Sequence, residues 1–245
     1  MYEDYVNSGK GRDAGLKEAK RNLIACEYAV EAMKDSTMIA PTMMPPQINA
    51  FSAQYFPSLT ANEIFLVYTA LTGAEQKNMA PSEKPVRKSK LPKSDINLIG
   101  IHQDENILVS RKDQNGKWKP AVSISKNINS KEYSEGATAI SGDGKSLVMT
   151  ICNHPDGAGG CDLYFSKRKG DDWSKPENLG PKVNTAAKET YPTLSPDGRT
   201  MYFCSDRPGG KGGLDIWRSE LTDEGWSAPD NVGEPINTVG NEISP

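Results

Sequence analysis

The sequence predicts a mainly β protein: a partial β-propeller of about three four-stranded blades and the start of another, preceded by an amphipathic helix. Three observations predict this fold class. Two landmark residues recur with a period of about 50 residues, each copy consists of strand and turn signals, and no helical pattern separates the copies. A solenoid is the alternative, but tight hairpin turns require antiparallel pairing, which argues against a parallel β-helix.

The two landmarks are a tryptophan and an asparagine that keep a fixed offset. The tryptophans recur at intervals of 55 and then 53 residues, and each is followed eleven residues later by the asparagine. The residues are Trp118, Trp173 and Trp226, with Asn129, Asn184 and Asn237. We interpret both landmarks as residues that pack every blade. The first copy has diverged most.

Hairpin turns divide each copy into strands. The Asp-Gly pairs at 143–144 and 197–198 lie between apolar runs, where glycine accepts a positive φ. The runs that follow, 146–150 and 200–204, lack helical spacing and predict strands buried on both faces. An earlier unit has its turn at 62–63.

A shorter strand is expected after each glycine-rich loop, over 162–166 and 215–219. Asp162 and Asp215 open these strands at the same position of two copies. A repeated position predicts a turn-capping hydrogen bond in every blade, whereas a catalytic acid would more often occur in one blade only.

Residues 1–36 are predicted to be a helical segment. Apolar residues recur over 14–35 at alternating steps of three and four, which places them on one helix face. They are Leu16, Ala19, Leu23, Cys26, Val30 and Met33. This face needs a partner, either the propeller or a preceding helix.

The rest of the chain divides into a proline-rich linker over 37–50 and incomplete propeller blades over 51–245. Within the first blade, 70–104 is a basic insertion in which 96–101 adds a strand. Residues 237–245 repeat 184–192, so the chain is expected to open another blade and to be a fragment.

Three motifs are similar to the WD40-like (PD40, TolB-type) propeller repeats: Tyr191-Pro-Thr-Leu-Ser-Pro-Asp-Gly198, Pro208-Gly-Gly-Lys-Gly-Gly213 and Trp226-Ser-Ala-Pro-Asp-Asn-Val-Gly233. The chain resembles in particular outer-membrane-associated periplasmic proteins of Bacteroidetes-type bacteria. Those proteins join a TPR segment, such a propeller and an OmpA-like peptidoglycan-binding domain, and a type IX secretion component is one of them. The resemblance covers residues 24–245 in outline and is specific in the last two units.

The resemblance implies a periplasmic scaffold, associated with the outer membrane, whose partners are other envelope proteins. Peptidoglycan would be bound only through a domain absent from this chain. The helical segment over 1–36 would then be the end of a TPR-like region.

Cys152 and Cys161 bracket one glycine-rich loop and are expected to form a structural disulfide. Strands leaving a tight loop bring their ends close together, and an envelope location would oxidise the pair. Two alternatives stay open: a metal site that adds His154 but lacks an obvious fourth ligand, and two reduced thiols in a cytosolic protein. The aligned residues of the third copy are Ser205 and Leu214.

The remaining cysteines, Cys26 and Cys204, are expected to be small buried hydrophobic residues. Cys204 aligns with Ile151 in a buried strand. Neither has a base or an electropositive setting in the sequence that would make it a nucleophile.

Composition and motifs argue against several function classes. The net charge of -3 gives no reason to expect a nucleic-acid partner, and no apolar run is long enough to span a membrane. The glycine-rich loops join strands instead of opening a helix, so no phosphate cofactor is expected. With two histidines and no Ser-His-Asp order, we expect no metal site, no cofactor and no enzymatic activity.

The candidate interaction surfaces are the loop faces around Arg207, Lys211 and residues 70–104, because loops on a rigid frame carry recognition. The second hypothesis is a small ligand or glycan in the central channel, lined by Tyr55, Tyr133 and Tyr191, or a propeller that gates a hydrolase domain.

Overall fold

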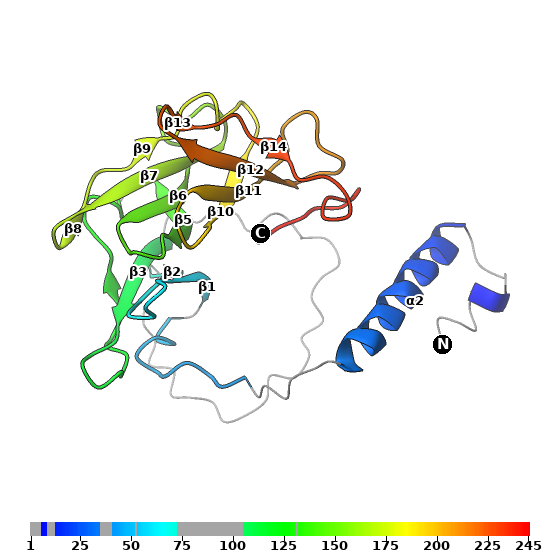
Figure 1. Cartoon of the computed structure of the whole chain (residues 1–245), viewed down its shortest axis with the longest axis horizontal. Coiled ribbons are helices and arrows are strands. Elements are labelled where there is room, and N and C mark those ends of the chain that lie inside the picture. Colours follow the sequence, from blue (N-terminus) through cyan, green and yellow to red (C-terminus); the bar gives the residue numbers. More distant parts are fainter. Residues whose placement is uncertain (1–5, 9–12, 35–40, 52, 73–104, 131) are drawn as a thin grey trace. The chain divides into compact units, whose positions relative to one another are not determined.

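The computed structural model describes residues 6–8, 13–34, 41–51, 53–72, 105–130 and 132–245 (Figure 1). The chain divides into two compact units, Met1–Met43 and Met44–Pro245. In the first unit, helix α2 spans Asp13–Lys34, inside the predicted helical segment. No helix among the described residues is long and apolar enough to cross a membrane.

The predicted apolar face of α2 is only partly buried. Ala19 is 5% exposed and Leu16 and Leu23 are half-buried, whereas Val30 is 63% exposed and Cys26 is exposed. The prediction of a buried Cys26 is therefore wrong, because the helix face on which it lies is exposed at Cys26 and Val30.

The second unit contains three antiparallel sheets that follow one another along the chain, and we call them blades 1, 2 and 3 (Figure 1). Blade 1 consists of β1 Gln54–Leu59, β2 Phe65–Leu71, β3 Glu105–Arg111 and β4 Val122–Ser123. Blade 2 consists of β5 Ser134–Ile140, β6 Ser146–Cys152, β7 Cys161–Lys169, β8 Asp172–Trp173 and β9 Glu177–Asn178. Blade 3 consists of β10 Glu189–Leu194, β11 Thr200–Ser205, β12 Asp215–Thr222, β13 Gly225–Trp226 and β14 Asp230–Asn231. The first four strands of each sheet are neighbours in chain order, as in a propeller blade, so the predicted fold class is confirmed.

Two short strands share the outermost position in blades 2 and 3. Both β8 and β9 pair with β7, and both β13 and β14 pair with β12. The third strands, at nine and eight residues, extend beyond the predicted segments 162–166 and 215–219. They are longer because each must carry two outer partners.

The hydrophobic cores lie between neighbouring blades. One cluster joins β2 and β3 of blade 1 to β5, β6 and Trp173 of blade 2, and the next joins β6 and β7 to β11, β12 and Trp226. Trp118 takes part in a third cluster, which includes Ile48 and Phe51. Trp173 and Trp226 therefore pack between their own blade and the preceding blade. Trp118 packs between blade 1 and the segment that precedes blade 1.

Residues 45–49, predicted as linker, form a turn that belongs to the repeat. The N–H groups of residues 48 and 49 bond the Pro45 carbonyl at 2.9 and 3.1 Å. The N–H groups of residues 183 and 184 bond the Gly180 carbonyl in the same way, at 3.1 and 2.9 Å. Ile48, 4% exposed, covers blade 1 as Val183 covers blade 3. This part of the linker is therefore corrected to the closing turn of a blade module.

The predicted insertion over 70–104 also needs a correction at its start. Ala70 and Leu71 pair with Asn106 and Glu105, so they belong to β2. The strand predicted over 96–101 lies outside the described residues.

Candidate functional site at the loop end of the blades

In every blade the first strand begins, the second ends and the third begins at the same edge of the sheet, which we call the loop end. The β6–β7 loop and the β11–β12 loop lie there. The predicted site residues fall into two groups. Those that recur at the same position of several blades hold the blades together, and the others occur in one blade only.

The three landmark asparagines clamp the third strand of their own blade. In blade 2, Asn184 Oδ1 accepts a hydrogen bond from the Leu163 N–H, and its Nδ2 donates to the Leu163 carbonyl, both at 2.9 Å. Asn129 does the same to Ile107, and Asn237 to Ile216. The side-chain amide thus replaces a strand partner and satisfies buried backbone groups.

Asp162 and Asp215 cap the glycine-rich loops. Asp162 Oδ1 accepts from the Ala158 N–H at 3.0 Å, and Asp215 Oδ2 accepts from the Lys211 N–H at 2.7 Å. The capped loops need glycine, since a Cβ at Gly210 would lie 1.9 Å from Asp215 Oδ2. The geometry is that of a structural turn cap.

Two glutamates, which sequence reasoning missed, bond the first strands of blades 2 and 3 to the turns before them. Ser130 Oγ donates to Glu135 Oε1 at 2.6 Å, and Thr185 Oγ1 donates to Glu189 Oε1 at 2.7 Å. Thr238 and Glu242 repeat this contact at 2.5 Å. The signal was present as Asn-Ser or Asn-Thr followed by Glu a few residues later.

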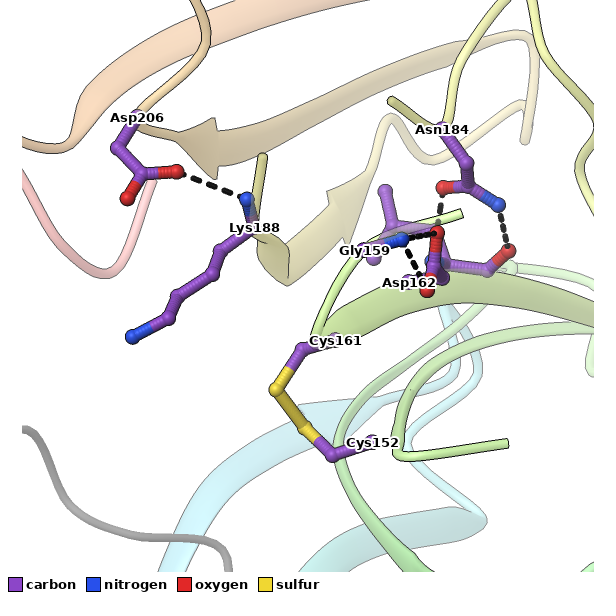
Figure 2. Close-up of a disulfide and its surroundings, with 8 residues drawn as sticks. Cys152, Gly159, Cys161, Asp162, Asn184, Lys188 and Asp206 are labelled. Atoms are coloured by element: carbon purple, nitrogen blue, oxygen red, sulfur yellow. Dashed lines mark hydrogen bonds between the residues drawn. A yellow bond between two sulfur atoms is a disulfide. The ribbon is translucent and has the colours of Figure 1, made fainter. Parts of the chain in front are cut away.

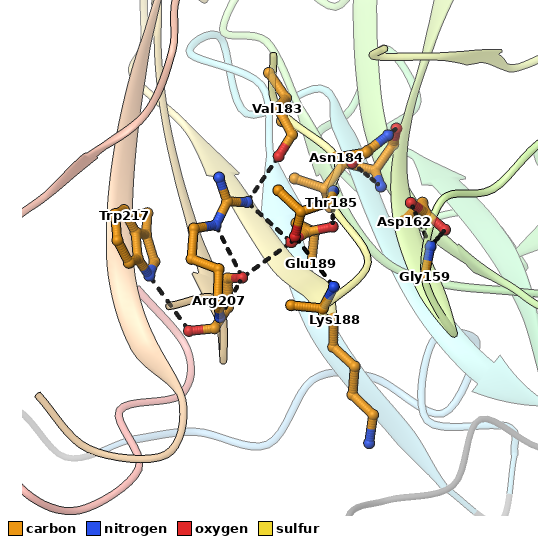
Figure 3. A network of polar contacts seen from close by, with 12 residues as sticks. Gly159, Asp162, Val183, Asn184, Thr185, Lys188, Glu189, Arg207 and Trp217 are labelled. Atoms are coloured by element: carbon orange, nitrogen blue, oxygen red, sulfur yellow. Dashed lines mark hydrogen bonds and ion pairs between the residues drawn. The ribbon is translucent and has the colours of Figure 1, made fainter. Parts of the chain in front are cut away.

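Arg207 strengthens this contact in blade 3 and is not a surface residue. It is 8% exposed, lies 3.0 Å from Glu189 Oε1 and donates to the Val183 carbonyl at 2.7 Å (Figure 3). Its guanidinium also stacks on the rings of Phe203 and Trp217, at 4.9 and 5.1 Å. The prediction that Arg207 offers an interaction surface is wrong, because its charge neutralises a buried carboxylate.

Lys211, the other predicted surface residue, has a side chain that is 41% exposed and forms an ion pair with Glu234. This pair holds the pKa of Glu234 below its usual range. Lys211 is therefore exposed at the loop end of blade 3 and paired with Glu234, and its predicted role in contacting a partner stays a prediction.

Cys152 and Cys161 are joined by a disulfide between directly paired residues of β6 and β7, with their Cα atoms 4.0 Å apart (Figure 2). The bonded sulfurs leave no thiolate for the alternative metal site with His154. Among the residues that the structure describes, no group of three or more His, Cys, Asp or Glu side chains is placed to hold a metal ion.

The alignment of Cys152 with Ser205 is wrong by one residue. Ser146 N–H bonds Ser141 Oγ and Thr200 N–H bonds Ser195 Oγ, and counting forward from these turns places Asp206 opposite Cys152. Blade 2 then has one extra loop residue, Asn153, with φ 58°.

The same count moves the counterpart of Cys204 from Ile151 to Thr150. Cys204 is nevertheless fully buried, and burial raises the pKa of its thiol to about 12. It is the small hydrophobic residue that the sequence predicts.

His154 of blade 2 is the counterpart of Arg207, since each precedes a proline and contacts the aromatic ring of the third strand. The His154 and Tyr164 ring centroids are 5.3 Å apart. Its Nδ1, however, contacts the Asp156 carboxylate, to which the Tyr164 hydroxyl also donates at 2.5 Å. On its other side His154 meets Tyr133, with ring centroids 4.5 Å apart.

Glu135 consequently lacks the cation that Glu189 has. Its Oε2 is buried with no hydrogen-bond partner among the described residues, and the residue is 1% exposed. Burial raises the pKa of Glu135 to about 7, against the opposing effect of the Ser130 hydrogen bonds. Burial also raises the pKa of Glu189, where Thr185 and Arg207 act in the opposite direction.

The inner strands bring Tyr55 and Tyr191, but not Tyr133, to one place. Phe56 and Tyr191 occupy the same bulge position of β1 and β10, with φ 53° and 54°, and their rings stack 4.9 Å apart. The Tyr55 hydroxyl bonds the buried carboxylate of Glu105. Burial and this carboxylate raise the pKa of Tyr55.

No protein-family model matches the chain, and no curated protein matches it. Similar solved structures include TolB from Acinetobacter baumannii, at 14% identity and a TM-score of 0.37 over 72% of this chain and 32% of that one. They also include a puromycin-hydrolyzing peptidase of Mycobacterium tuberculosis (17%, 0.36, 74% and 23%) and a periplasmic gluconolactonase of Pseudomonas aeruginosa (10%, 0.35, 81% and 48%). The chain spans less than two thirds of the length of these structures.

Proposed function

We propose that this chain is part of a non-catalytic β-propeller that serves as a protein-binding scaffold in the bacterial cell envelope. One observation carries the proposal. The repeated polar residues hold the blades together, whereas exposed side chains found in one blade only, such as Asp156, lie at the loop end of blade 2. Unrepeated side chains on a rigid frame are where a scaffold would recognise a partner.

The proposed location is the periplasm, in association with the outer membrane. The disulfide of blade 2 supports an oxidising compartment, since such bonds are rare in the cytosol. Contact with peptidoglycan would need a domain that this chain does not contain. We further propose a role in type IX secretion, on the resemblance of the sequence motifs to those of the type IX secretion component PorE.

Site-directed photo-crosslinking in cells tests the scaffold proposal. A crosslinking amino acid at Ala158, on the loop end of blade 2, is compared with one at Asp171, at the opposite edge of the same sheet. We expect a discrete crosslinked envelope protein from Ala158 and none from Asp171. Equal crosslinking from both positions, or none from either, would contradict the proposal.

The Phe56–Tyr191 stack favours a second candidate function, the binding of a small ligand or glycan on the inner strands, with gating of a hydrolase domain as a variant. Both residues have a positive φ, which strains the backbone of a residue that carries a side chain, and such backbone strain is common at ligand sites. Titration with muropeptides should then change tyrosine fluorescence in the wild type and not in Phe56→Ala. An unchanged signal in the wild type would remove this candidate.

A further inference from the structure

Blade 3 shows how this propeller binds a guanidinium group, because it binds that of its own Arg207. Arg207 places its charged group between the carboxylate of Glu189 and the rings of Phe203 and Trp217. The arginine belongs to the chain itself, so the site is filled permanently.

Blade 2 repeats the frame of this site without the arginine. Glu135 stands at the position of Glu189, paired with Ile151 as Glu189 is with Ser205, and Tyr164 stands at the position of Trp217. The shorter His154 replaces the arginine and turns to Asp156. Ile151 also replaces Ser205, whose hydroxyl donates to Glu189 Oε1 at 3.0 Å. The buried Glu135 Oε2 has no hydrogen-bond donor among the described residues.

Further negative charge surrounds this place, in contrast to blade 3. The side chain of Asp156 is 57% exposed, whereas its counterpart in blade 3 is Gly209. Exposed Glu132 is hydrogen-bonded to Tyr133, and the charges of Glu132 and Asp156, added to desolvation, raise the pKa of the Tyr133 hydroxyl. The Asp156 carboxylate and the rings of Tyr133 and Tyr164 therefore contact His154, with Glu132 beside Tyr133.

We propose that the loop end of blade 2 binds an arginine side chain presented by a partner protein. This inference rests on the proposed scaffold function and names the chemistry of its partner. The guanidinium displaces His154 from the Tyr164 ring and donates to Glu135 and Asp156, as Arg207 does to Glu189. A planar fork of donors fits two carboxylates and stacks on a ring, which a lysine ammonium does less well.

The test uses the full chain and two tripeptides with acetylated and amidated ends, Gly-Arg-Gly and Gly-citrulline-Gly. Citrulline has nearly the shape of arginine but no charge. We expect calorimetry to give roughly ten-fold tighter binding of the arginine peptide, because hydrogen bonds to charged groups are the stronger ones. His154→Arg should abolish this preference by filling the site from within. Asp156→Asn should weaken it.

Asp171→Asn is the matched control, since it removes an exposed carboxylate from the opposite edge of the same blade, and it should bind like the wild type. Retained melting temperatures establish that the variants fold. Equal binding of the two peptides, no binding by the wild type, or wild-type binding by His154→Arg would each overturn the inference. A crosslinked partner that persists in His154→Arg would leave the scaffold function standing and reject this site.

Discussion

The asparagine clamp gives the sharpest test of how the blades are held. Asn184 is 2% exposed and makes three hydrogen bonds, two to Leu163 and one at 2.8 Å to Asn178 Oδ1. Each hydrogen bond contributes about 1 kcal/mol, so Asn184→Ala should lower the free energy of unfolding by roughly 3 kcal/mol. The Leu163 N–H and carbonyl would be left buried without this partner, which adds to the cost.

The chain offers a matched control at the same position of the repeat. Asn49 is exposed, and its Nδ2 donates to the Met44 carbonyl at 2.6 Å, so Asn49→Ala should cost about 1 kcal/mol or less. Denaturant unfolding of both variants, followed by tryptophan fluorescence, measures the difference. If Asn184→Ala were no more destabilised than Asn49→Ala, the clamp would not be what holds the third strand.

Three further predictions follow from the same contacts. Replacing both Cys152 and Cys161 by serine should cost roughly 2–3 kcal/mol in the absence of reductant, and dithiothreitol should destabilise the wild type but not the variant. Arg207→Ala should lower the free energy of unfolding by roughly 3–5 kcal/mol, because it leaves the buried Glu189 carboxylate unpaired; urea unfolding that showed a loss under 1 kcal/mol would contradict this. Burial raises the pKa of Glu135 from its ordinary value of 4.5 to about 7 in the folded state, so the folded state binds the proton more tightly than the unfolded state and stability should fall as pH rises between these values. Glu135→Gln should show a smaller fall in melting temperature over that range.

The fold class could be predicted from the sequence because the same pattern of strands, turns and landmark residues occurs in three copies. Tryptophan and asparagine keep their offset since one packs between blades and the other clamps the third strand. The same regularity located the hairpin turns and the capping aspartates. A single copy of any of these signals would have been ambiguous.

The errors arose where a copy departs from the others. One extra residue, Asn153, shifts the register between the two halves of blade 2, so Cys152 was aligned with Ser205 instead of Asp206. Arg207 looked like a surface residue because a charged side chain in a loop usually is one. Its burial depends on Glu189, a partner that lies in another strand and that no local pattern points to.

The repeat therefore serves as an internal control for function. Where all copies share a residue, its role can be checked against the same contact in the next blade, and in every such case here the contact is structural. Where one copy differs, the neighbouring blade shows what the change has removed, as His154 does beside Glu135. A buried carboxylate without a cation lowers stability, which makes blade 2 the place to look for a partner that supplies one.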